Sequence, residues 1–466
     1  MSGAPFTLTA AEMADAFGGT LVAGDATTLL PDVSIDSRSL PAGALFVAIA
    51  GPRFDGHAFI DDAIARGAAG IVVSDVTAAA RVPHGVAVVH VHDTLRGLQQ
   101  AANVVRRRAA TRLVAITGSA GKTTTKEITA ALLSTHCTTF RTRGNLNNHI
   151  GLPLSLFELR TSPAMGVVEL GMSGAGEIRR LVEIAEPDVR VWTNVGSAHL
   201  GHFESIDAIA SAKAEILEQA DRHTLLVANA GDPRVMSHAR GFVGRTLTFG
   251  VNVDADVQVR DVEARGAQGM RGVLVAGGDG HRFATPLLGD GNLANIAAAT
   301  AVALDAGVSL DRILETVATL GPAPHRGQVL HAPGGWTIID DAYNSSPEAL
   351  LRAIDTLATS SGRRIAFLGE MLELGDQTER LHAECGRALA AAHPEALVAV
   401  GGPAAEALAS GAIHAGLEAD RVSHEPTSDA LVRRVHALVR PGDVVLVKGS
   451  RGIAMDRVVT ALMGEA

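Results

Sequence analysis

The sequence predicts an α/β protein built from three domains. Its 466 residues are too many for one hydrophobic core, and 47% of them are hydrophobic, which is enough for several cores. Residues 114–134 have the order buried strand, glycine loop, helix, and residues 364–447 alternate strands with helices, as parallel sheets do. We expect a small α/β domain, a central parallel-sheet domain and a Rossmann-like α/β domain at residues 1–92, 93–320 and 321–466.

Composition and charge argue against several classes of protein. A net charge of −10 is unsuited to general nucleic-acid binding. No apolar run has the length of a membrane span, and the N-terminus lacks the charged-then-apolar order of a secretory signal. Cys137 and Cys385 lie far apart without metal-ligand spacing, which favours a reduced, cytoplasmic setting.

The first domain is expected to mix short helices with strands. Thr9 and Glu12 have the spacing of a capping box, which starts a helix. Residues 43–49 and 70–73 are apolar and β-branched enough to be strands.

One polar stretch of this domain, Asp36-Ser37-Arg38, has two interpretations. The three side chains could bind a phosphorylated ligand. They could equally form a solvated turn with a local ion pair, which is common on protein surfaces.

The stretch 114–126 is the strongest local signal, because a strand, a glycine loop and a helix are what a phosphate cradle needs. Lys122 can reach the β- and γ-phosphates, and the Thr123 hydroxyl can ligate Mg²⁺. Ile116 stands where the longer P-loop pattern has glycine, so the pattern here is the shorter G-x-x-G-K-T-T-T. A chance Gly-Lys-Thr at a helix start is the alternative. We expect the helix over residues 126–134.

Other elements of the central domain follow from periodicity and capping. Residues 94–108 read as a helix whose three final arginines complement the helix dipole. Strands are expected at 166–170 and 188–194, and a helix at 206–219. Asn292 is a plausible N-cap of an alanine-rich helix.

Four polar side chains of this domain are candidate metal-site or structural residues. Glu169 ends a buried strand and either points into the ligand crevice as a Mg²⁺ ligand or is a paired structural glutamate. His199 and His202 have metal-like spacing, and His199 is favoured because it lies nearer the strand end. A lysine such as Lys213 is by default a surface residue.

Residues 143–153 are too rich in Asn and Gly for an ordinary strand. They offer hydrogen-bond donors and acceptors near the phosphate loop, or they form a simple turn cluster.

The last domain follows a proline-containing hinge at residues 321–327. Asp340, Asp341 and Tyr343, the single tyrosine of the chain, stand at a strand end and suggest ligand contact. Beyond them we expect strands at 364–368, 396–400 and 443–447, and helices at 377–392, near 404 and at 428–439.

These motifs agree in order and spacing with one enzyme family. The chain resembles, over essentially its whole length, the Mur ligases, which are ATP-dependent enzymes that form amide bonds. Any one motif is moderate evidence, whereas the ordered set is strong. The set comprises residues 36–38, 55–57, 118–126, 144–153, 169–177, 194–199, 213–216, 340–347, 369–375 and 448–451.

The resemblance also indicates a substrate. The family member that adds a diamino acid carries Asp-Asn-Pro-Arg in its last domain, and this sequence has no such tetrapeptide. The implied activity therefore joins D-alanyl-D-alanine to a UDP-N-acetylmuramoyl-tripeptide through an acyl phosphate, with ATP and Mg²⁺, during peptidoglycan synthesis in the cytoplasm. The implied enzyme acts on these small molecules as a monomer, without nucleic-acid or membrane partners.

The resemblance further implies residue roles. A bare ammonium near Mg²⁺ is electrostatically wrong, so Lys213 is expected to be a carbamate. Lys122, Glu169, His199 and Lys213 are expected to be catalytic, and Thr123, Glu169, His199 and Lys213 to hold metal. ATP contacts are expected from Gly118, Ser119, Ala120, Gly121, Lys122, Thr123, Thr124, Asn295, Arg326 and Asp341. Substrate contacts are expected from Ser37, Arg38, Asn147, Asn148, Tyr343 and Asn344.

One departure from the family concerns the adenine site, where Gly291 takes the place of a histidine and Asn295 is retained. Three other functions compete with the implied one: a folate polyglutamylating relative, a P-loop kinase or NTPase switch, and a non-catalytic nucleotide-binding scaffold. The first domain argues against the folate enzyme, and the third domain against a kinase. The intact Lys122, Thr123, Glu169 and His199 argue against a scaffold.

Overall fold

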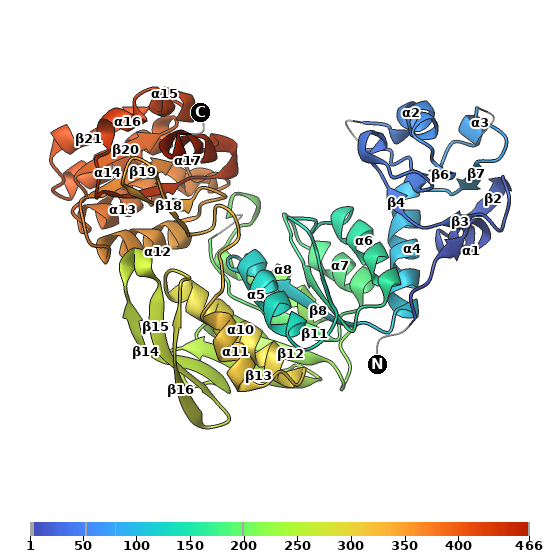
Figure 1. Ribbon diagram of the computed structural model, residues 1–466, viewed down its shortest axis with the longest axis horizontal. Coiled ribbons are helices and arrows are strands. Elements are labelled where there is room, and N and C mark those ends of the chain that lie inside the picture. The colour runs from blue at the N-terminus through green and yellow to red at the C-terminus, as the bar shows by residue number, and fades with distance from the viewer. Residues whose placement is uncertain (1–3, 52–53, 80, 198–199, 465–466) are drawn as a thin grey trace. The chain divides into compact units, whose positions relative to one another are not determined.

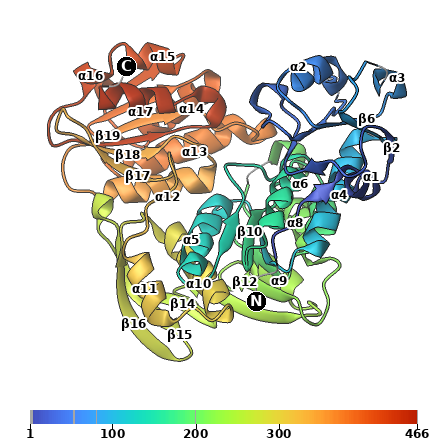
Figure 2. The same cartoon turned by 45° about the vertical axis from the view of Figure 1, so that its right-hand side comes forward.

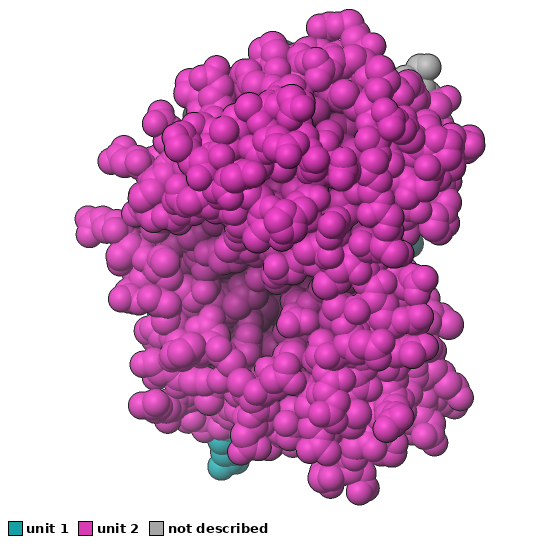
Figure 3. Space-filling view, turned by 90° about the vertical axis from the view of Figure 1, so that its left-hand side faces the viewer, with its two compact units in different colours: residues 1–116, 137–190, 215–224 teal, residues 117–136, 191–214, 225–466 magenta. Residues whose placement is uncertain are grey.

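The computed structural model describes residues 4–51, 54–79, 81–197 and 200–464, which form an α/β protein (Figures 1 and 2). The chain divides into two compact units. Unit 1 consists of Met1–Ile116, Cys137–Arg190 and Glu215–Thr224, and unit 2 of Thr117–His136, Val191–Ala214 and Leu225–Ala466. In the space-filling view, the surface of unit 2 is hollowed near the middle of the face shown (Figure 3).

Unit 1 begins with a five-stranded sheet in the order β2-β7-β6-β5-β4. Strands β4 to β7 are parallel, and β2 is antiparallel to β7. Phe46 and Ile71 from the sheet pack with Ile60 in its core. The strands are β2 (Thr20–Ala23), β4 (Val33–Ser34), β5 (Leu45–Val47), β6 (Gly70–Val73) and β7 (Ala87–His90), beside the pair β1 (Leu8–Thr9) and β3 (Leu29–Leu30).

The predicted capping box is confirmed at the first helix, α1 (Ala10–Ala16). Thr9 N–H donates to Glu12 Oε2 at 2.9 Å, and Glu12 N–H donates to Thr9 Oγ1 at 3.2 Å. Two shorter helices follow in this part of the chain, α2 (Ile60–Ala65) and α3 (Val76–Ala79).

The second sheet has nine strands among the described residues, in the order β16-β15-β14-β13-β12-β11-β8-β10-β9. Strands β8, β9 and β10 are parallel, and β14, β15 and β16 form an antiparallel meander that the sequence analysis did not predict. The strands are β8 (Arg112–Thr117), β9 (Thr139–Arg141), β10 (Met165–Glu169), β11 (Val189–Trp192), β12 (Leu225–Asn229), β13 (Arg245–Val251), β14 (Val257–Ala264), β15 (Met270–Ala276) and β16 (Asp279–Thr285).

Three predicted helix limits in this region are wrong. Helix α5 begins at Lys122, four residues early, because Gly121 adopts φ +83° and turns the loop directly into the helix. Helix α8 ends at Ala214, because buried Glu215 turns to bond the backbone of Gly176. The helices are α4 (Thr94–Arg108), α5 (Lys122–Ser134), α6 (Gly151–Leu156), α7 (Glu177–Ala185), α8 (Ile206–Ala214), α9 (Pro233–Ala239), α10 (Asp290–Asp305) and α11 (Leu310–Val317).

The third wrong limit is the N-cap of α10. The helix begins at Asp290 and its cap is Gly289, so Asn292 lies inside the first turn. Asn292 instead donates its amide to the Leu288 carbonyl at 2.8 Å.

The three arginines at the end of α4 do more than complement the helix dipole, because each pairs with a carboxylate of unit 1. Arg106 is buried and bonds Asp188 at 2.7 Å, Arg107 bonds Glu186, and Arg108 bonds Glu12.

The third sheet belongs to unit 2 and has the order β17-β18-β22-β19-β20-β21. All its neighbouring strands are parallel except β17, which is antiparallel to β18. This doubly wound arrangement confirms the predicted parallel sheet with helical crossovers. The strands are β17 (Gln328–His331), β18 (Thr337–Asp341), β19 (Arg364–Gly369), β20 (Ala396–Val400), β21 (Val422–Glu425) and β22 (Val444–Lys448).

Helices cover both faces of this sheet (Figure 1). One core joins Leu350, Leu389 and Leu408 to the sheet, and the other uses Leu431 and Val458. The helices are α12 (Pro347–Ala358), α13 (Thr378–Ala390), α14 (Pro403–His414), α15 (Ser428–Val432), α16 (Val435–Leu438) and α17 (Asp456–Met463).

The single helix predicted at 428–439 is wrong, because α15 and α16 are separate. Arg434 leaves helical geometry (φ −127°, ψ 0°) and its side chain reaches Glu425 and Ser423 on β21. Within the described ranges, no helix is long and apolar enough to cross a membrane.

Candidate active site

The glycine loop after β8 has the conformation that its sequence predicts. Gly118 (φ +150°) and Gly121 (φ +83°) have left-handed or nearby backbone angles that other residues adopt only with strain. A Cβ atom at Gly118 would overlap Thr193 Oγ1, and one at Gly121 would overlap Asn295 Oδ1. Both glycines are therefore required by backbone angle and by close packing.

Thr193 and Asn194, which follow β11, fix the glycine loop through hydrogen bonds to Ala120 within unit 2. Asn194 Oδ1 accepts from Ala120 N–H at 2.9 Å, and Asn194 Nδ2 and Thr193 Oγ1 both donate to the Ala120 carbonyl. Ser119 N–H donates to the Asn194 carbonyl at 3.0 Å. Thr193 and Asn194 were missed as loop-shaping residues, although their place at a strand end was a usable signal.

Two lysines of unit 2 share this region. Lys122 Nζ donates to the Gly118 carbonyl at 2.8 Å, so the ammonium lies over its own loop. Lys213, on α8, is only 1% exposed, which makes the alternative of a solvent-facing lysine wrong. Burial, reinforced by the charge of Lys122, holds the pKa of Lys213 well below its usual range. Both effects favour the neutral amine over the ammonium.

Glu169, in unit 1, is the last residue of β10. It pairs with Ile116 of the parallel neighbour β8, and Ile116 lies two residues before Gly118 in the sequence. Glu169 is only 3% exposed, and its Oε1 accepts from Asn147 Nδ2 at 2.8 Å. The Asn-rich stretch thus forms turns, as one of its two interpretations expected, and also provides a partner for Glu169. Asn148 also has a structural partner, since its Oδ1 accepts from the N–H groups of Ile150 and Gly151 at the start of α6.

The donors suit Mg²⁺ by chemical type. The carboxylate of Glu169 and the hydroxyl of Thr123 are each hard oxygen donors, and the amine of Lys213 would become one only as a carbamate. The residues that the structure describes contain no cluster of three or more His, Cys, Asp or Glu able to hold a metal. His199 lies outside the described residues, and His202 is exposed, as expected.

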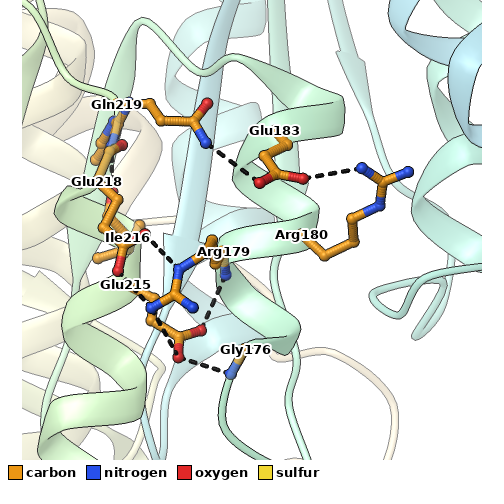
Figure 4. A network of polar contacts seen from close by, with 9 residues as sticks. Gly176, Arg179, Arg180, Glu183, Glu215, Ile216, Glu218 and Gln219 are labelled. Atoms are coloured by element: carbon orange, nitrogen blue, oxygen red, sulfur yellow. Dashed lines mark hydrogen bonds and ion pairs between the residues drawn. The ribbon is translucent and has the colours of Figure 1, made fainter.

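Glu215 is a second residue that the sequence analysis missed. Its carboxylate is buried and accepts from the N–H groups of Gly176 (2.6 Å) and Arg179 (3.0 Å), at the start of α7 (Figure 4). Arg179 also pairs with Glu218. This network fixes the glycine-rich turn that follows β10.

Asn295 lies against the phosphate loop. It is buried, its Oδ1 accepts from Thr125 Oγ1, and its Nδ2 donates to Asn292 Oδ1, both at 3.1 Å. At Gly291, an added Cβ would stand 3.1 Å from Nε of Arg352, so an arginine occupies the space beside this position.

In the last part of unit 2, Asp341 ends β18 and pairs with buried Lys448. Lys448 Nζ donates to Asp341 Oδ2 at 2.6 Å and to the Asn344 carbonyl at 2.9 Å. Next to them, the guanidinium of Arg326 stacks on the Tyr343 ring at 4.0 Å. The structure thus brings four predicted ligand-contact residues together at the carboxyl edge of this sheet.

The Asp36-Ser37-Arg38 stretch forms the local ion pair that was one of its two interpretations. Arg38 bonds Asp36 at 2.9 Å and its side chain is 85% exposed, whereas Ser37 is buried. A substrate role for Ser37 and Arg38 stays a prediction.

Comparisons with known proteins cover nearly the whole chain. Three family models match in order: "Mur ligase family, catalytic domain" at residues 32–119, "Mur ligase middle domain" at 116–303, and "Mur ligase, glutamate ligase domain" at 325–451. A UDP-N-acetylmuramoyl-tripeptide–D-alanyl-D-alanine ligase from Bacillus subtilis is 34% identical over 440 residues, 94% of each chain. The chain belongs to the Mur ligase family.

Further relatives agree. The Escherichia coli ligase of the same name is 33% identical over 98% of each chain. The crystal structure of MurF from Acinetobacter baumannii superimposes with a TM-score of 0.88 at 30% identity, covering 99% of this chain and all of that one. MurF from Thermotoga maritima in complex with ADP has a TM-score of 0.82 at 30% identity, covering 93% and 97% of the two chains. The predicted Mur ligase resemblance and fold class are confirmed.

Proposed function

We propose that this Mur ligase joins D-alanyl-D-alanine to UDP-N-acetylmuramoyl-tripeptide, with ATP cleaved to ADP and phosphate, in the synthesis of peptidoglycan precursors. The observation that carries the proposal is full-length similarity to ligases of that name, together with an intact phosphate loop. The missing Asp-Asn-Pro-Arg tetrapeptide argues against a free diamino acid as acceptor. The ADP bound to the Thermotoga maritima relative supports the use of ATP.

The reaction starts when the free carboxylate of the tripeptide attacks the γ-phosphoryl group and forms an acyl phosphate. The dipeptide amine then attacks the acyl carbon, and the tetrahedral intermediate collapses to an amide as phosphate leaves. Two anions have to meet, so positioning and electrostatic stabilisation carry most of the catalysis. Lys122, the loop N–H groups and the N-terminus of α5 supply positive potential for the phosphates.

A Mg²⁺ ion bound here would supply Lewis-acid stabilisation of the phosphate charge. Thr123, Glu169, His199 and a carbamylated Lys213 are the ligands that we propose. Support for the carbamate comes from burial of Lys213 and its lowered pKa, since only the neutral amine reacts with CO₂. The carbamate turns a cation that would repel Mg²⁺ into an anion with two oxygen donors.

The remaining predicted residues are assigned by their position in the chain. Asn295 faces adenine, Arg326 the γ-phosphate and Asp341 the ribose. Contacts to the nucleotide-linked substrate come from Ser37, Arg38, Asn147 and Asn148, and contacts to the dipeptide come from Tyr343 and Asn344.

The domain division at residues 92 and 320 is part of the proposal. It is supported by the first sheet, which lies wholly before residue 92, and by the third sheet, which lies wholly after residue 320. We also propose that the enzyme is a monomer. Light scattering of the purified protein tests the monomer, and limited proteolysis tests the boundaries.

Phosphate release tests the proposed function. The complete mixture contains ATP, Mg²⁺, UDP-N-acetylmuramoyl-tripeptide and D-alanyl-D-alanine, and each component is left out in turn. We expect turnover only in the complete mixture, and little when a free diamino acid or glutamate replaces the dipeptide. Equal or faster turnover with either replacement would reassign the acceptor. Phosphate release without any acceptor would instead indicate an NTPase.

A further inference from the structure

The single tyrosine of the chain has two guanidinium groups beside its ring. The Cζ of Arg326 lies 4.0 Å from the Tyr343 ring centroid, and the Cζ of Arg451 lies 5.7 Å from it. The three residues belong to unit 2 but come from three segments: before β17, after β18 and after β22. Tyr343 and Arg451 both follow parallel strands at their carboxyl ends, where open α/β sheets bind ligands.

These two arginines leave positive charge at that edge. Within the described part of the chain, no carboxylate lies within ion-pair distance of Arg326 or Arg451, whereas Arg363 and Arg457 of the same sheet region each hold an aspartate. The nearby Lys448 is already neutralised by Asp341. A surplus guanidinium with an exposed fork is suited to binding a carboxylate with two parallel hydrogen bonds.

The backbone that carries Arg451 is held in place. Ser450 N–H donates to the Glu370 carbonyl at 3.0 Å, and Ser450 Oγ accepts from Leu372 N–H at 2.9 Å. The segments that carry Tyr343 and Arg326 are also joined, because Tyr343 N–H donates to the carbonyl of His325, the neighbour of Arg326, at 3.0 Å. Little conformational freedom remains for the segments to lose when a ligand binds, which favours affinity.

We propose that Arg451 binds the terminal carboxylate of the acceptor dipeptide and so selects a dipeptide with a free C-terminus. The assignment rests on the proposed function and on Arg326 facing the γ-phosphate. The acceptor's amine has to reach the acyl phosphate while its carboxylate is held away from that anion. An extended dipeptide spans about 7 Å, so its terminal carboxylate can be bound at a separate point from its amine.

The test compares D-alanyl-D-alanine with its C-terminal amide, at saturating ATP and tripeptide, in the wild type and in Arg451→Gln. The wild type should prefer the free acid by roughly tenfold to a hundredfold in kcat/KM, the worth of a charge-assisted hydrogen-bond pair. Arg451→Gln should have a KM for the free acid raised by about that factor. It should use acid and amide almost equally, with the KM for ATP unchanged.

Two variants control the experiment. Arg451→Lys keeps the charge without the planar fork and should retain part of the preference. Arg387→Gln removes an exposed arginine in the last turn of α13 and should keep the full preference. The assignment is overturned if Arg451→Gln keeps the wild-type ratio of acid to amide, or if only its KM for ATP rises. A wild type that shows no turnover dependent on the dipeptide overturns the proposed function itself, which is a distinct result.

Discussion

The buried ion pair between Lys448 and Asp341 gives the sharpest stability prediction. Lys448→Met keeps the side-chain volume but removes the cation, so Asp341 loses its 2.6 Å partner and the Asn344 carbonyl loses a donor. Removing one partner of a buried pair costs about 3–5 kcal/mol. The lysine is 2% exposed but the aspartate is 24% exposed, so water can partly replace the ammonium. We therefore expect a loss of about 3 kcal/mol, at the low end of that range.

Hydrogen exchange is the appropriate assay, because a chain of several domains does not unfold in one step. The free energy of opening measured at amides of β18 and β22 should fall by about 3 kcal/mol. Arg457→Met is the matched control: its pair with Asp429 is 59% exposed on both sides, so its loss should cost less than about 1 kcal/mol. Equal effects of the two substitutions would refute the reasoning. The KM for ATP should also rise in Lys448→Met, because Asp341 is no longer held in position.

Three further predictions concern the active site and one loop. Lys122→Ala should lower turnover by about a hundredfold or more without changing thermal unfolding, and near-normal phosphate release would contradict the phosphate-loop role. Lys213→Arg keeps a cation that cannot be carbamylated, so it should be nearly inactive, and bicarbonate should restore activity to CO₂-depleted wild type but not to this variant. His382 is buried, accepts from Met371 N–H at 2.8 Å and bonds the Thr378 carbonyl at 2.7 Å. Burial lowers the pKa of His382, so its contribution to stability is complete above the unfolded value of 6.5 and is lost as pH falls through the lower folded pKa. The thermal unfolding temperature of His382→Gln should therefore fall less at acid pH than that of the wild type. If the two proteins have the same dependence on pH, His382 is not a source of the acid sensitivity.

Local patterns in the sequence predicted much of the fold. The helix at Thr94–Arg108 and the strand at Gly70–Val73 agree with their predicted limits, because an amphipathic period and a β-branched run are local properties. The meander β14-β15-β16 was not predicted, since its residues alternate weakly and several are exposed. Helix starts were also displaced where a glycine with positive φ shortened the loop, as at Gly121.

The candidate site was predictable in its residue types but not in its partners. The sequence marked Glu169 and Asp341 as strand-end carboxylates, which is visible from the run of apolar residues before each. It did not reveal that Asn147 bonds the first and Lys448 the second, because each pair joins residues far apart in the chain. Burial of Lys213 was equally invisible, since an alanine-rich helix can pack on any side.

The most direct test of the central claim follows one oxygen atom. The tripeptide substrate is prepared with ¹⁸O in its terminal carboxylate and is converted with ATP and D-alanyl-D-alanine. Because an acyl phosphate passes its bridging oxygen to the leaving phosphate, the account predicts one ¹⁸O in each inorganic phosphate released, together with a product heavier by one dipeptide minus water. Unlabelled phosphate alongside that product would contradict the acyl-phosphate route, and labelled phosphate without the amide product would contradict the ligase itself.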